Sequence, residues 1–82
     1  MIKPTLHLNG TGKKMLVEGY EKAHRAIREA SKALGEIEFN ARDYYVQGPQ
    51  AWPQAIKEME CRIGMLGRIE REIEEIIISL IQ

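Results

Sequence analysis

The sequence predicts an all-α fold, an antiparallel helical hairpin with a short extended N-terminal arm that oligomerises into a helix bundle. Apolar residues recur every three or four positions along two long segments, and glycine and proline separate these segments. The second segment carries more apolar surface than one neighbouring helix can cover. We expect one domain, residues 1–82, made of an arm (1–10), helix 1 (about 12–39), a loop (40–49) and helix 2 (about 50–81).

The N-terminal arm is predicted from a side-chain pattern that repeats every two residues. Residues 1–10 alternate apolar and polar side chains, which is typical of extended chain. Pro4 restricts this segment to an edge strand or a solvated strand. Gly10 and Gly12 then interrupt the chain before helix 1.

Helix 1 is predicted from an uninterrupted heptad seam. Two members of this seam are alanines, which would let another helix approach closely. The seam consists of Leu16, Tyr20, Ala23, Ile27, Ala30, Leu34 and Ile37.

Helix 2 follows two prolines, Pro49 and Pro53, a residue type that suits the first turn of a helix. Further apolar residues lie off its main stripe, so other protomers are expected to cover it. The stripe consists of Ile56, Met59, Ile63, Leu66, Ile69, Ile73, Ile76 and Leu80.

A short loop makes the two helices antiparallel neighbours. Residue 38 should then face roughly residue 52, and residue 12 roughly residue 77. Residues 78–82 would extend beyond helix 1, beside the arm. Ile2, Leu6 and Leu8 could therefore pack on Ile77 and Ile81.

Composition limits the class of function. Twelve basic and twelve acidic residues balance, which argues against generic binding of nucleic acid. The basic surplus of residues 1–32 would lie beside the acidic C-terminal half. Cys61 is the only cysteine, and the histidines and Cys61 are not clustered, so neither an intrachain disulfide nor a metal site is expected. Oligomerisation is the remaining source of stability for so short a chain.

No stretch is apolar enough to span a membrane, and no signal peptide is recognised, so we expect a cytoplasmic protein. Catalysis is not predicted, because no Ser–His–Asp or Cys–His arrangement is visible, and no cofactor is expected. His24 is interpreted as a packed or solvated residue rather than a ligand. The Glu-rich stretch of helix 2 is interpreted as a solvated face.

The first candidate site is the start of helix 1. The spacing of Gly10, Thr11, Gly12 and Lys13 does not fit a P-loop, because Lys14 stands where Ser or Thr is required. A glycine-rich turn that opens a helix still offers backbone N–H groups to an anion, and two lysines add positive charge. The alternative is a solvated helix start beside the acidic C-terminal segment.

The second candidate site is the loop. It concentrates Arg42, Tyr44 and Tyr45, and Trp52 follows it. Aromatic rings beside a guanidinium can stack and clamp a nucleobase. The alternative is that these rings close the end of the hairpin. Helix 1 is about 40 Å long, so the two candidate sites can meet only if a second protomer packs antiparallel or by two-fold symmetry.

Two motifs resemble those of small uncharacterised phage and prophage proteins: KPTLHLNGT at residues 3–11, and Asn40, Arg42–Tyr45 and Gln47–Pro49 in the loop. In architecture the chain is also similar to the phage anti-CBASS and anti-Thoeris sponges. This second resemblance implies sequestration of a cyclic nucleotide or ADP-ribose-type signal at protomer interfaces, without cleavage. The alternatives are a protein-binding hairpin, such as an anti-CRISPR or host-takeover factor, and a small virion accessory protein.

Overall fold

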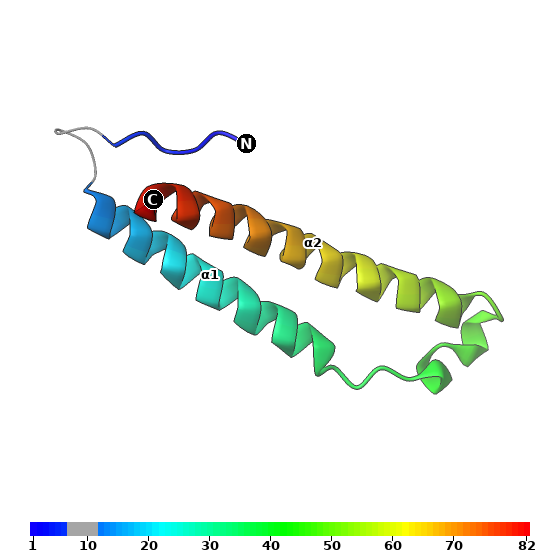
Figure 1. Ribbon diagram of the computed structural model, residues 1–82. Helices are drawn as coiled ribbons and strands as arrows, with labels where there is room; N and C mark the ends of the chain where they lie inside the picture. The colour runs from blue at the N-terminus through cyan, green and yellow to red at the C-terminus, as the bar shows by residue number, and fades with distance from the viewer. Residues whose placement is uncertain (7–11) are drawn as a thin grey trace.

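The chain folds as a helical hairpin, shown in the computed structural model of Figure 1, which describes residues 1–6 and 12–82. Helix α1 spans Lys13–Gly35 and helix α2 spans Ala51–Ile81. They pack side by side in opposite directions, and the described residues contain no strand. The molecule is 61 Å long and only 21 and 18 Å across. The all-α hairpin predicted from the sequence is confirmed.

Helix α1 ends four residues earlier than predicted. The backbone N–H of Glu36 still donates to the carbonyl of Lys32 at 3.1 Å, after which the chain leaves the helix. Gly35 stabilises a helix poorly, since it gives up more backbone freedom than other residues. Phe39, which was predicted to be helical, instead packs against rings beyond the helix. The prediction that helix 1 reaches residue 39 is therefore wrong.

The connection is longer than the predicted loop and spans residues 36–50. It contains two 3-10 turns, Ala41–Asp43 and Tyr45–Gln47. Gly48 follows them with φ of 111°, a conformation that side-chain-bearing residues rarely adopt. Helix α2 then begins one residue later than predicted and places Pro53 in its first turn, where proline removes no helical hydrogen bond.

The contact between the helices follows the predicted seam of α1 except at Ala30 and at Ile37, which lies beyond the end of α1 and is 50% exposed. Leu16, Tyr20, Ala23, Ile27 and Leu34 are half-buried, as expected. Ala30, however, is exposed, and Ser31 takes the half-buried position. A straight α-helix repeats every 3.6 residues, whereas a heptad seam repeats every 3.5. The line of contact therefore moves gradually around the helix, here from Ala30 to its neighbour Ser31.

The contacting side of α2 includes most of the predicted stripe. Ile63 and Ile69, which were expected in the stripe, are exposed. Leu80 is the one buried hydrophobic residue among those described. The half-buried members of the stripe are Ile56, Met59, Leu66, Ile73 and Ile76.

The register of the hairpin differs from the predicted one. His24 contacts Glu74 and Arg28 contacts Glu70, which sets the start of α1 beyond the end of α2. The end of α2 therefore does not extend past α1, because the connection takes residues from both predicted helices. Ile2 is 96% exposed and does not pack on α2, contrary to expectation. Residues 1–6 contain neither helix nor strand, and Leu8 lies outside the described residues.

Candidate functional site

Three aromatic rings close the end of the hairpin where the connection meets α2. The ring centroids of Phe39 and Trp52 are 4.9 Å apart, and those of Tyr44 and Trp52 are 5.8 Å apart. Phe39 and Tyr44 meet edge to face at 5.7 Å, a favourable geometry for aromatic pairs. All three side chains are half-buried. Tyr44 and Trp52 thus have a packing role, which was one of the two interpretations left open by the sequence.

Tyr45 points away from this aromatic cluster into solvent. Its side chain is 73% exposed, and that of its neighbour Val46 is 76% exposed. Arg42, in the preceding turn, is also exposed. Of the predicted stacking residues, Tyr45 is the one whose ring is free to contact a ligand.

The backbone of the connection holds these side chains in place. The N–H of Asp43 donates to the carbonyl of Asn40 at 3.1 Å, and the N–H of Tyr44 donates to that of Ala41 at 3.0 Å. The N–H of Gln47 donates to the carbonyl of Tyr44 at 2.9 Å. These successive turns orient Tyr44 inward and leave Arg42 and Tyr45 outside.

The other predicted site lies at the start of α1. Gly12 has extended backbone angles, and its carbonyl accepts the first helical hydrogen bond, from the N–H of Leu16 at 3.1 Å. Lys13 and Lys14 are exposed, and the first turn of α1 holds no acidic side chain. The first N–H groups of a helix have no partner within it, so this end offers donors as well as positive charge. Gly10 and Thr11 lie outside the described residues.

The two predicted clusters are not brought together within one chain. Lys13 begins α1 at one end of the elongated hairpin, and the connection with Arg42 and Tyr45 lies at the other end (Figure 1). A small ligand can touch both clusters only if they come from different protomers.

A polar cluster that sequence reasoning missed joins the two helices near their middle. The Nε2 atom of His24 lies 2.8 Å from Oε1 of Glu74 and 4.0 Å from Oε1 of Glu70. The Nε atom of Arg28 lies 3.5 Å from the same oxygen of Glu70. The spacing of four residues between the two glutamates, which places both on one face of α2, was the available signal.

This polar cluster is also the place where the described residues could hold a metal ion. One ligand atom each from His24, Glu70 and Glu74 lies within 4.8 Å of the others. Imidazole and carboxylate are ligands that zinc accepts. The Arg28 guanidinium already neutralises Glu70, however, and Glu74 accepts the hydrogen bond of a histidine that donates through Nε2. These contacts between charged and polar side chains explain the cluster as a polar link between the helices.

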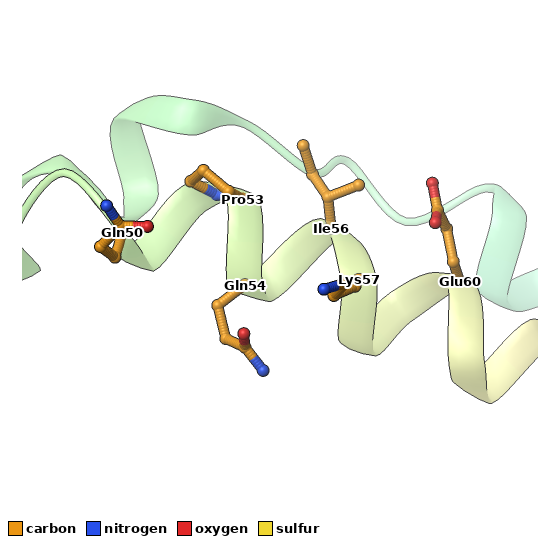
Figure 2. A pocket seen from close by; sticks show the side chains of 6 residues that line it. All are labelled: Gln50, Pro53, Gln54, Ile56, Lys57 and Glu60. Carbon is orange, nitrogen blue, oxygen red and sulfur yellow. The ribbon is translucent and has the colours of Figure 1, made fainter.

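The part of the chain that the structure describes includes two shallow hollows. Figure 2 shows the first, of about 340 Å³, along the first turns of α2. The second, of about 350 Å³, lies on α1. Neither includes a residue predicted as a ligand contact. The first is lined by Gln50, Pro53, Gln54, Ile56, Lys57 and Glu60, and the second by Arg25, Arg28, Glu29 and Lys32.

In residues 1–6 and 12–82, no helix combines the length and the apolar character needed to cross a membrane. Comparisons with protein families, with curated proteins and with solved structures find no match to this chain.

Proposed function

We propose that the chain is a non-catalytic binding protein that sequesters a small nucleotide-type immune signal between protomers, as an anti-defence protein of a phage does. The observation that carries this proposal is the separation of two exposed groups of ligand-type side chains. Lys13 and Lys14 lie at one end of the hairpin, and Arg42 and Tyr45 lie at the other. Each group by itself offers half of a nucleotide site.

The lysine end supplies the phosphate half. Two exposed ammonium groups beside the free N–H groups of a helix start attract an anion through both charge and hydrogen bonds. Lysines in the first turn also oppose the helix dipole, so they reduce helix stability. A residue placed against a local preference is typical of a functional position.

The connection supplies the base half. The exposed ring of Tyr45 can stack on a nucleobase, and the guanidinium of Arg42 can pair with phosphate or stack beside the ring. The packed rings of Tyr44 and Trp52 hold the turn that presents Tyr45. We therefore assign direct contact to Tyr45 and Arg42, and support to Tyr44 and Trp52.

Native mass spectrometry tests this proposal. The protein would be purified from cells that express a synthase of cyclic dinucleotides, and in parallel from cells that express a synthase of cyclic ADP-ribose. We expect an oligomer whose mass exceeds that of the protein by a whole number of signal molecules for each pair of protomers. An oligomer without added mass from either source, together with no calorimetric binding of either class at micromolar concentration, would rule the proposal out.

A second candidate, a hairpin that binds another protein, is favoured by a different observation. Large apolar side chains remain exposed along α2, including Met65 at 60% and Ile69 at 44%. Apolar patches that stay exposed after assembly mark protein-binding surfaces. Hydrogen exchange on the purified oligomer separates the candidates. Fast exchange of the α2 amides around Ile69 favours a missing protein partner, and slow exchange favours burial by a second copy.

A further inference from the structure

One broad side of the hairpin is apolar and uncovered, and the opposite side carries the polar link between the helices. Ala33 follows His24 by nine residues, and Met65 precedes Glu74 by nine residues. Nine residues correspond to about two and a half turns, so both residues point away from the His24–Glu74 pair. Ala33 and Met65 therefore share one side of the molecule, which we call the apolar face. It is made of Ala26, Ala30, Ala33, Met65 and Ile69.

The exposed area is larger than that of a compact monomer of this mass, in part because residues 1–6 are extended and mostly exposed. The chain exposes 6639 Å² at a mass of 9.4 kDa, about a third more than the roughly 5000 Å² of a compact monomer of that mass. The excess is above the roughly 800 Å² that each partner buries in a standard protein interface. A second copy of the chain is large enough to cover the difference.

The apolar face is nearly symmetric about its own centre. The His24–Glu74 and Arg28–Glu70 contacts set the register, so that Ala30 is level with Arg68. Ala26 and Ala33 lie on either side of Ala30. On α2, Met65 and Ile69 lie on either side of the same level. A patch that is symmetric in this way matches itself after a two-fold rotation, as the interfaces of two-fold dimers must.

The charges at the rim of the apolar face are also self-complementary. Arg62 lies one turn before Met65, and Glu72 lies one turn after Ile69, each about half exposed. Within α2, Arg62 pairs with Glu58 at 3.7 Å and Glu72 pairs with Arg68 at 3.6 Å, so a contact between copies would exchange or extend these surface pairs. When two α2 helices cross in opposite directions about this centre, Arg62 of one copy meets Glu72 of the partner subunit. The same contact forms a second time by symmetry. Polar rims around apolar centres are typical of protein interfaces.

From these observations we propose that a second copy packs on the apolar face as a two-fold dimer with the hairpin ends opposed, its axis passing near Ala30. The α1 helices approach closely, because the central residues Ala26, Ala30 and Ala33 are small. The α2 helices meet through Met65 and Ile69. The result is a four-helix bundle in which each helix runs antiparallel to both of its neighbours.

This dimer deepens the proposed function, on which its functional consequence rests. Lys13 precedes Ala30 by 17 residues, and Ala51 precedes Arg68 by the same number, about 26 Å along each helix. The two-fold axis therefore sets Lys13 level with the start of α2 in the other copy, next to the connection that carries Tyr45 of the partner subunit. Two composite sites follow, one at each end of the dimer.

Disulfide cross-linking tests the arrangement, with Cys61→Ser as background so that the engineered thiols are the only ones. Ala30→Cys should cross-link to itself almost completely under mild oxidation, because two residues near a two-fold axis lie within the roughly 7 Å that a disulfide spans between Cα atoms. A mixture of Ala30→Cys and Met65→Cys proteins is the competing probe. Bundles with both hairpin ends on the same side would place Ala30 against Met65 of the partner subunit, and a predominant mixed disulfide would overturn the proposal.

Sedimentation of two matched variants gives an independent measurement without any ligand. Ile69→Glu places a charge in the apolar face and should raise the dimer dissociation constant at least about 100-fold. Ile78→Glu is the control, since Ile78 is exposed to a similar degree, 49%, on the side of Glu74. Equal weakening by both variants, or a monomeric parent protein, would refute the dimer. A dimer that forms as proposed but binds no cyclic nucleotide would instead refute the proposed function alone.

Discussion

The Nε2 atom of His24 on α1 lies 2.8 Å from Oε1 of Glu74 on α2, and the two residues are 50 positions apart in the chain. This contact, with that of Arg28 to Glu70, fixes how far one helix is displaced along the other. The offset of α1 along α2 determines which residues lie level with one another across the hairpin. It therefore also determines where the centre of the apolar face lies. The polar link on one side thus determines the geometry of the apolar side.

Loss of this link should weaken the hairpin moderately. His24→Ala removes one cross-helix hydrogen bond to a carboxylate that is half exposed, so we expect the free energy of unfolding to fall by about 0.5–1 kcal/mol. Urea denaturation followed by circular dichroism measures the change. Glu75→Gln, an exposed neighbour on α2, is the control and should leave the midpoint unchanged. Equal midpoints for His24→Ala and the parent protein would mean that the register is set by apolar packing alone.

Substitutions in and beside the aromatic cluster distinguish rings that pack from a ring that is free to contact a ligand. Phe39→Ala removes a half-buried ring that contacts both Tyr44 and Trp52, and should cost about 1–3 kcal/mol of unfolding free energy. Tyr45→Ala, at a solvent-exposed ring, should stay within about 0.5 kcal/mol of the parent protein. Thermal melts monitored by Trp52 fluorescence report both. A large loss of stability for Tyr45→Ala would show that its ring is covered in the assembled protein.

The end of α2 provides a test of the core. Leu80 is 4% exposed, whereas the next residue, Ile81, is 57% exposed. Leu80→Ala should therefore destabilise the protein by about 2–3 kcal/mol, since truncation of a buried leucine leaves a cavity. Ile81→Ala should cost under about 1 kcal/mol. Chemical denaturation of the two variants at one protein concentration makes the comparison, and a reversed order would show that Ile81 faces a partner in the oligomer.

Local pattern was sufficient to predict both helices. The spacing of Leu16, Tyr20, Ala23, Ile27 and Leu34 indicates one helix whatever surrounds it, because 3.6-residue periodicity is a property of the helix itself. Pro49 and Pro53 predicted the start of α2 to within one residue, because proline suits the first turn of a helix and disrupts its interior. These signals involve only neighbours in the sequence.

Features that depend on distant residues were not predictable in this way. Phe39 lies beyond the end of α1 and packs on Tyr44 and Trp52, a contact that helical periodicity does not predict. The His24–Glu74 contact depends on how many residues the connection takes up, and the loop was expected to be shorter. The same error in register explains why α2, contrary to expectation, does not extend past the start of α1. The predicted register places His24 opposite roughly residue 66, and its contact with Glu74 is about two turns away, a shift that changes every cross-helix pair at once.

Complementation between two inactive proteins tests the composite site most directly. Lys13→Ala/Lys14→Ala removes the phosphate half of each site, and Arg42→Ala/Tyr45→Ala removes the base half; all four side chains are exposed, so both proteins should fold. Each protein alone should bind no cyclic nucleotide or cyclic ADP-ribose. When they are mixed in equal amounts and allowed to exchange, half of the dimers contain one chain of each kind, and each such dimer has one intact site. Calorimetry should therefore recover about a quarter of the parent site number, at the parent affinity.

Lys57→Ala and Val46→Ala, which remove an exposed charge and an exposed apolar side chain elsewhere, are the matched controls and should bind normally. Zero recovery, with subunit exchange verified by mass spectrometry, would place both halves of the site in one chain and would contradict a pocket shared between protomers.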